Sequence, residues 1–402
     1  MRGYDVAVVG GGPAGSRAAA VLANSGLKVL IIDPLSSMKP CGGYLSAKAL
    51  RQLAPDLIAD ILPRPVQTVR LLSSGSGSMV VRSRQPLGYM FRRETLDCCL
   101  LAAAEAAGAE LWRRQRATQF RQTGESVEII TDKGQGASAR YLVGADGVHG
   151  KTSVQAGVRG GSWPRWQLAY ARVAELRLPD GAATLDQSEI QLVCLPIMGG
   201  FGWIFPLPGG VNVGVAGSSL ELPRIESHFA TLLQQLQAKV GHSELSWQRG
   251  WWLPAGGFPR RIATARTLLV GDAAGFVDSF SGEGIYYALL SGQLAAQAIV
   301  RHFGEANRVM LDYRRQCGRL IMPTLRRSLL LSSSIGRHKE RYYQALLKQP
   351  ELATHLLSLM REDRPYHGRL AVLLQAFFLA RLWPAEQAED VEVFGTQTGP
   401  VW

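Results

Sequence analysis

Residues 5–33, DVAVVGGGPAGSRAAAVLANSGLKVLIID, determine the fold expected at the start of the chain. Asp5–Val9 predicts a short buried strand, Ser16–Ser25 an alanine-rich helix, and 28–32 a second strand. A G-x-G-x-x-G spacing joins the first strand to the helix. This is a complete βαβ unit, and its helix N-terminus suits a pyrophosphate. Asp33 ends the second strand, where it can accept hydrogen bonds from ribose hydroxyls.

Each glycine of this fingerprint has a geometric task. Gly10 permits a tight turn, Gly12 lets a pyrophosphate approach the backbone, and Gly15 allows close helix–strand packing. Pro13 and Ala14 complete the predicted binding turn. A glycine-rich turn without a ligand shares the spacing, but here the strand, the helix and the terminal acid are in register. Because the unit starts within the first few residues, we expect no signal peptide.

Composition limits the classes of protein to which this chain can belong. Its 402 residues are enough for two or three domains, and 47% hydrophobic with 19% charged residues is an ordinary globular balance. No apolar run reaches the roughly 18 residues that span a bilayer. Five cysteines without a C-x-x-C pair predict a reducing cytoplasmic location, no disulfide framework and no metal site.

The net charge of +12 is either a solvated basic surface or a source of attraction to something acidic. The acidic candidates are an anionic cofactor, an acidic protein partner or carrier protein, and the inner membrane face. No nucleic-acid motif occurs, which disfavours nucleic acid. Basic amphipathic segments at 320–331 and 370–383 could dock on the protein or a second subunit, or lie peripherally at a lipid interface.

A cysteine followed by two glycines comes soon after the nucleotide unit. Gly42 and Gly43 let the backbone lie flat against a planar ring, and Cys41 could tune a redox ring or shuttle a proton. The alternative is that Cys41 is only a small buried residue.

Two further charged residues are candidates for cofactor contacts, one near the start of a predicted helix and one after a predicted strand. Arg93 lies one helical turn before Asp97, so it either makes a local ion pair or reaches a cofactor diphosphate. Asp146 and Gly147 follow a strand predicted at 139–144, and they are either a second ribose or phosphate contact or part of a plain turn.

The pattern changes from Trp163 to about Trp252, where alternating strands predict a mostly antiparallel sheet. Within it, Trp203 and Phe205 line one face, either as ordinary core or as a wall of an apolar substrate cavity. Beyond it, Asp272 ends a buried strand and can bind a ribityl hydroxyl. Gly282, Gly284 and Ile285 then open a long helix whose backbone N–H groups can stabilise negative charge on a flavin ring.

Four stretches, in this order, resemble the single-Rossmann FAD-dependent oxidoreductases of the p-hydroxybenzoate hydroxylase fold, which include flavin monooxygenases and halogenases. They are Gly10–Gly15 with Asp33, Arg93 with Asp97, Gly144–Gly147 and Gly271–Gly284. Within that group the chain looks most like the geranylgeranyl reductase family, through KPCGG at 39–43 and FGWIFP at 201–206. It departs from that family's usual pattern at Tyr44 (usually Gly), Gly150 (Ser), Ser153 (basic), Met198 (Pro) and Phe201 (Tyr).

The resemblance implies FAD stretched across the Rossmann domain. Ala117 would touch the adenine edge through its backbone, Cys41 would lie close to the isoalloxazine on the substrate side, and Trp203 and Phe205 would line an apolar tunnel. These three, Cys41, Trp203 and Phe205, are the predicted catalytic residues. The predicted cofactor residues are Gly10, Gly12, Pro13, Ala14, Gly15, Asp33, Cys41, Gly42, Gly43, Arg93, Ala117, Asp146, Gly147, Asp272, Gly282, Gly284 and Ile285.

The expected fold is α/β, with a Rossmann-type FAD-binding domain interrupted by a mostly antiparallel β-sheet substrate domain, plus C-terminal helices. The predicted ranges are 1–65, 88–160 and 255–305 for the FAD domain, 66–87 and 161–254 for the substrate domain, and 306–402 for the helical region.

The expected activity is that of an FAD-dependent oxidoreductase on a bulky apolar or aromatic substrate. In the favoured hypothesis, reduced flavin delivers hydride to a C=C bond of a prenyl-type chain, with a proton from Cys41 or water. In the alternative hypothesis, reduced flavin and O2 hydroxylate an aromatic group, which can belong to a protein side chain or to a carrier-bound substrate. A less favoured version of this alternative is halogenation of the aromatic group. Only one dinucleotide fingerprint is present, so NAD(P)H must visit transiently or a separate donor must supply electrons.

Overall fold

The computed structural model describes residues 1–34, 39–73, 77–179, 185–255, 260–336, 359, 361, 366 and 391–397. Its contacts group the chain into two compact units. Unit 1 comprises residues 1–38, 94–167 and 254–326, and unit 2 comprises 39–93, 168–253 and 327–402. Among the helices so described, none combines the length and the apolar character needed to cross a membrane.

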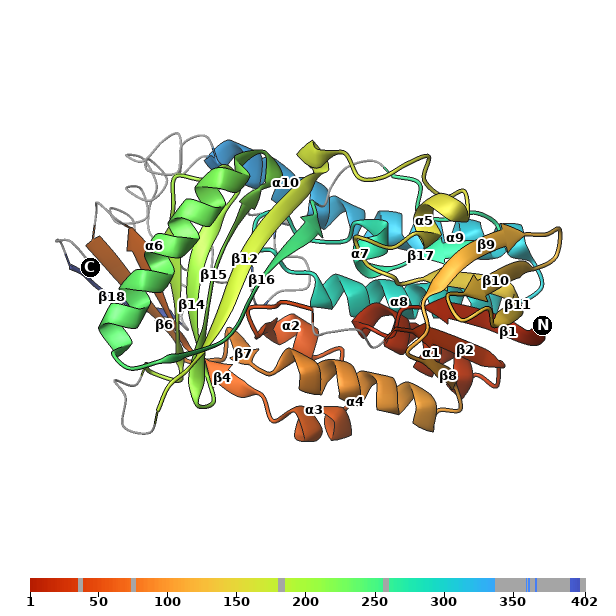
Figure 1. The fold of residues 1–402 in the computed structure, drawn as a ribbon, viewed down its shortest axis with the longest axis horizontal. Coiled ribbons are helices and arrows are strands. Elements are labelled where there is room, and N and C mark those ends of the chain that lie inside the picture. Colours follow the sequence, from red (N-terminus) through yellow and green to blue (C-terminus); the bar gives the residue numbers. More distant parts are fainter. Residues whose placement is uncertain are drawn as a thin grey trace. The chain divides into compact units, whose positions relative to one another are not determined.

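Unit 1 is built on a seven-stranded sheet (Figure 1). Its parallel part pairs β1 (Arg2–Val9) with β2 (Val29–Asp33) and β11 (Gly136–Gly144), with β8 (Glu110–Arg113) and β17 (Thr267–Leu269) outside them. An antiparallel extension adds β10 (Val127–Thr131) and β9 (Ala117–Gln122) to β11. The β1–α1–β2 unit expected from the glycine fingerprint is therefore present.

Helices of unit 1 pack against one another as well as on the sheet. Helix α1 (Pro13–Asn24) packs on α8 (Ile285–Arg301), which packs in turn on α9 (Ala306–Leu320). Helix α1 starts at Pro13 rather than at the predicted Ser16, because the fixed φ of proline suits a first helical turn. The remaining helices of this part are α4 (Arg93–Ala106), α5 (Thr152–Gln155) and α7 (Gly271–Ala274).

Unit 2 contains an eight-stranded sheet in the order β16-β12-β15-β14-β13-β5-β6-β18. In that order the strands are Glu244–Pro254, Leu168–Arg177, Gly210–Ser218, Phe201–Leu207, Glu189–Cys194, Thr68–Ser73, Gly77–Ser83 and Val391–Gln397. Pairing is antiparallel from β12 to β13 and from β5 to β18, whereas β5 and β13 are parallel. The expected mostly antiparallel sheet is confirmed.

A three-stranded sheet of β3 (Tyr44–Ser46), β7 (Gly88–Met90) and β4 (Arg64–Val66) also belongs to unit 2, as do α2 (Ala47–Leu50) and α3 (Pro55–Ile61). Helix α10 spans Met322–Gly336.

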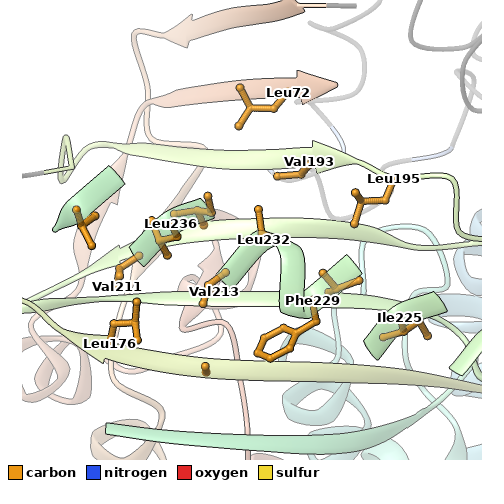
Figure 2. Packing of buried hydrophobic residues seen from close by; sticks show 14 of the residues in the cluster. Leu72, Leu176, Val193, Leu195, Val211, Val213, Ile225, Phe229, Leu232 and Leu236 are labelled. Carbon is orange, nitrogen blue, oxygen red and sulfur yellow. The ribbon is translucent and has the colours of Figure 1, made fainter. Parts of the chain in front are cut away.

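Helix α6 (Leu222–Val240) was not predicted, although its apolar spacing is that of an amphipathic helix. Ile225, Phe229, Leu232, Leu236 and Val240 are its buried residues. Figure 2 shows Phe229, Leu232 and Leu236 over Val211 and Val213 of β15, in the main apolar cluster of unit 2. The helix therefore closes one face of the sheet.

The α/β fold class is confirmed, and β18 adds a strand within the tail predicted to be helical. The compact units place residues 39–65 with the second sheet, whereas the sequence placed them in the FAD domain. The predicted ranges refer to cofactor and substrate binding, and they stay a prediction. The predicted basic segment 370–383 lies outside the described residues.

Leu232→Ala should lower the free energy of unfolding by about 2–5 kcal/mol, because it leaves a cavity between α6 and the sheet. Gln234→Ala, on the exposed side of the same helix, is the matched control and should change stability little. Chemical denaturation followed by circular dichroism measures both. Equal stabilities for the two variants would contradict the packing of α6 described here.

Candidate functional site

The N-terminus of α1 is confined by backbone on one side and open on the other. A Cβ added to Gly10 would lie 2.3 Å from the carbonyl oxygen of Ala145, and one added to Gly15 would lie 1.8 Å from that of Gly10. At Gly12, which precedes the helix, an added Cβ would meet no atom of the described residues within 4 Å, and none of their side chains caps the first turn. Uncapped N–H groups beside open space suit the oxygens of a diphosphate.

Asp33 ends β2 next to this turn. Its Oδ2 accepts a hydrogen bond from the backbone N–H of Gly11, which fixes the carboxylate beside the glycines. The N–H of Gln115 donates to the carbonyl of Asp33 at 3.3 Å and so brings the segment before Ala117 to the same end of β2. Ala117 is buried at the start of β9. These residues, predicted to contact the adenosine, therefore gather at one end of the sheet.

Small residues bring α8 and α7 against the first turn of α1. A Cβ on Gly292 would lie 2.2 Å from the carbonyl oxygen of Ala14, and one on Gly271 would lie 3.0 Å from the Cβ of Ala14. Oδ1 of Asp272 is 3.5 Å from the Cβ position of Gly284, the residue that precedes α8. Neither a capping side chain nor an acidic residue occupies the first turn of α8. The positive end of this helix dipole thus suits an electron-rich ring.

Asp278 shapes the loop that leads into α8. Its buried carboxylate accepts hydrogen bonds from the N–H groups of Phe280 and Ser281, both at 2.9 Å. Gly282 has a φ of +73° and donates its N–H to the carbonyl of Asp278 at 3.0 Å. In the part of the chain that the structure describes, an added Cβ at Gly282 would meet no atom within 4 Å. The loop therefore leaves room at Gly282, one of the residues predicted to lie against the flavin ring.

Asp146 is partly used inside the chain. Its Oδ2 accepts hydrogen bonds from the N–H and Oγ1 of Thr152, at 2.9 and 2.8 Å, while its buried Oδ1 has no partner among the described residues. Burial raises the pKa of Asp146 above its ordinary value, and the hydrogen bonds from Thr152 offset only part of this rise. A Cβ on Gly150 would lie 2.0 Å from the carboxyl carbon, so the glycine makes room for it. The cofactor role of Asp146 and Gly147 stays a prediction.

A cluster of positive charge supports the loop after β17. Arg260 donates to the carbonyl of Gly275 at 3.1 Å and to that of Ala255 at 2.7 Å. Arg260 and Arg159 both stack on Trp163, with guanidinium carbons 4.3 and 4.0 Å from the ring centroid. Burial, together with the charge of Arg159, lowers the pKa of Arg260 to about 9.

In unit 2, β14 presents an aromatic strip formed by Phe201, Trp203 and Phe205. Successive ring centroids are 6.0 and 6.1 Å apart, and Trp203 and Phe205 are buried. The neighbouring Ile204 belongs to the α6 cluster, so the strip lies on the other face of the sheet. A Cβ on Gly214 of β15 would lie 2.2 Å from the Trp203 ring, and the glycine therefore makes room for the indole.

The Cys41–Gly43 turn lies against this strip. A Cβ on Gly42 would be 3.1 Å from the ring of Phe205 and 3.3 Å from Nε1 of Trp203. Gly43 has a φ of +75°, and its N–H donates to Sγ of Cys41, a partly exposed residue, at 3.4 Å. The structure thus brings the three predicted catalytic residues together, and their catalytic role stays a prediction.

Sequence reasoning missed two residues that organise these sites, Gly292 in α8 and Asn212 in β15. The signal for Asn212 was an amide inside the run V-N-V-G-V, because asparagine is disfavoured in strand interiors. Arg93 is the first residue of α4, and its predicted contact with a diphosphate is untested. No group of three or more His, Cys, Asp or Glu side chains that could hold a metal ion occurs among the described residues.

Comparisons with known proteins identify relatives of this chain by sequence and by fold. A family described as FAD binding domain matches residues 3–180. A chloroplastic geranylgeranyl diphosphate reductase of Oryza sativa is 30% identical over 347 residues, 80% of this chain and 73% of the relative. A menaquinone reductase of Mycobacterium tuberculosis is 31% identical, over 73% of this chain and 76% of its own. The crystal structure of a geranylgeranyl bacteriochlorophyll reductase-like protein of Thermoplasma acidophilum superposes with a TM-score of 0.77 at 22% identity, covering 94% of this chain and 97% of that chain.

Gly12→Asp should leave the fold intact and lower the flavin content of the purified protein. The added Cβ has space and aspartate is a good helix N-cap, but its charge opposes a diphosphate. Gly3→Asp, at an exposed glycine where an added Cβ would also lie within 4 Å of no atom of the described residues, is the control and should keep its flavin. Flavin absorbance relative to protein absorbance measures both, and full flavin content in Gly12→Asp would refute a diphosphate at α1.

Proposed function

The chain belongs to the geranylgeranyl reductase family of FAD-dependent oxidoreductases, and from this premise we propose that it reduces carbon–carbon double bonds in a prenyl-type chain. The observation that carries the proposal is the contact between the Cys41 turn and the aromatic strip of β14. An apolar chain can lie along such a strip, and a thiol beside it can supply a proton. Geranylgeranyl diphosphate and menaquinone, named in two relatives, both carry a polyprenyl chain.

The reaction adds two hydrogens across one double bond. When bound, reduced FAD supplies hydride to one carbon and is oxidised by two electrons. The adjacent carbon takes a proton, for which Sγ of Cys41 is the proposed source. The N–H of Gly43, which donates to that sulfur at 3.4 Å, would stabilise the negative charge left behind. Cys41 is partly exposed, so solvent can return the proton.

The two units divide the remaining tasks in this proposal. Unit 1 binds the FAD through the uncapped N-termini of α1 and α8. Trp203 and Phe205 of unit 2 bind apolar substrate and exclude water from it. Because a single dinucleotide fingerprint is present, a transient nicotinamide nucleotide or an external donor would re-reduce the flavin. Contacts with an acidic protein, a carrier or a membrane remain predictions based on the charge of +12.

Anaerobic reduction of the flavin followed by geranylgeranyl diphosphate should give a product heavier by two hydrogens per reduced bond. The flavin should regain its oxidised spectrum in equal amount. Mass spectrometry of the product and absorbance of the flavin are the measurements. A failure to reduce this substrate or menaquinone, combined with oxygen incorporation into an aromatic substrate on mixing with O2, would replace the proposal by the monooxygenase alternative.

Cys41→Ser should slow product formation by roughly 100-fold, the scale of losing a general acid, with flavin content unchanged. The control is Cys98→Ser, which changes an exposed cysteine on α4 and should react at the wild-type rate. Single-turnover reduction of geranylgeranyl diphosphate measures the effect. An unchanged rate in Cys41→Ser would make Cys41 a packing residue and would leave water as the proton source.

A further inference from the structure

The side chain of Asn212 joins the aromatic strip to the cysteine turn. Nε1 of Trp203 donates to Oδ1 of Asn212 at 2.8 Å, and Nδ2 of Asn212 donates to the carbonyl of Cys41 at 2.9 Å. The same Nδ2 lies 3.5 Å from Oε1 of Glu175. Asn212 has no exposed surface. Both ends of the amide are therefore used, and water does not reach the residue to replace either hydrogen bond.

The sheet register explains why this position can make both hydrogen bonds. Asn212 is paired with Phe205 on β14 and with Glu175 on β12, so its side chain lies on the face of the aromatic strip. Gly214 lies two residues further along the same face. Its missing side chain lets the Trp203 ring lie over β15, from which the indole N–H reaches Asn212.

An apolar side chain at position 212 would be compatible with the strand and would avoid the cost of burying an amide. Val211, Val213 and Val215 occupy the other face of β15, in the α6 cluster. A buried amide loses its hydration, and only its hydrogen bonds compensate for that cost. The two hydrogen bonds of Asn212 end on Trp203 and on Cys41, the residues proposed to bind and protonate substrate. What the amide holds in place is thus the proposed reaction site.

We infer that Asn212 is a positioning residue for the reduction proposed above. It fixes the Cys41 turn and the Trp203 ring in one arrangement, so that the thiol and the apolar wall both lie against the same double bond of the substrate. The inference rests on the proposed function. It requires an amide, because one atom must accept from the indole while another donates to a carbonyl. Aspartate cannot donate and would face Glu175, and leucine can do neither.

The test uses the FAD-loaded protein with Asn212→Asp and Asn212→Leu, and with Val213→Ala as the control on the opposite face of β15. The first readout is the rate at which iodoacetamide alkylates Cys41, followed by peptide mass spectrometry, which needs no substrate. Release of the turn should raise this rate several-fold in both Asn212 variants, whereas Val213→Ala should keep the wild-type rate.

The second readout is steady-state reduction of geranylgeranyl diphosphate. In Asn212→Asp we expect kcat to fall about tenfold or more, because a displaced acid loses its alignment, while KM changes little because aspartate can still accept from the indole N–H of Trp203. Each rate is expressed per FAD-loaded enzyme, measured by flavin absorbance, so that a loss of folded protein does not by itself lower kcat. In the Cys41→Ser background, Asn212→Asp should cause no further loss of kcat, because the two residues act through one group.

Wild-type alkylation and wild-type kcat in flavin-loaded Asn212 variants would overturn the inference. If Asn212→Leu does not fold, Asn212→Asp carries the test, because aspartate keeps an acceptor for the indole N–H and removes the donor to the Cys41 carbonyl. Failure of the proposed function looks different: the wild-type protein would not reduce the substrate, while the alkylation rate would still respond to Asn212.

Discussion

Backbone-to-backbone contact around α1 is the constraint on which the cofactor half of this protein depends. A side chain at Gly15 would overlap the carbonyl of Gly10, and one at Gly292 would overlap that of Ala14. Helix α1 can therefore lie closer to the β1 turn and to α8 than side chains would permit. This packing fixes the direction of the α1 N-terminus, so the backbone N–H groups that are predicted to bind a diphosphate would need no side-chain ordering on binding.

The second sheet uses its two faces for different purposes. One face is closed by α6 through residues such as Phe229 and Leu232, which gives the strands a rigid apolar support (Figure 2). The other face carries the aromatic strip and the Asn212 amide. Since side chains alternate along a strand, adjacent residues such as Val213 and Asn212 serve these two purposes without conflict. Rigid support on one face is what allows precise placement on the other.

Local patterns predicted most of the fold. The glycine fingerprint and the runs before Asp33 and Asp272 gave a correct βαβ unit and a correct strand–loop–helix, and β13 was predicted at its observed bounds, Glu189–Cys194. Helix α6 was missed because strand-like alternation on both sides of it masked the spacing of Ile225, Phe229 and Leu232. Strand β18 gains its partner, β6, only through a pairing across most of the chain, which no local pattern encodes.

The sequence by itself determined the α/β class and a dinucleotide-binding turn, because a turn that requires glycine, a helix start and a strand-end acid are all local features. The choice of FAD came from the resemblance to a known family. Only the tertiary structure decided which polar atoms meet. Asn212 and Cys41 are 171 residues apart, and their hydrogen bond exists because β15 and the cysteine turn pack on the same aromatic strip. The hydrogen-bond partners of a buried amide are set by packing in three dimensions, and the spacing of residues along the chain does not predict them.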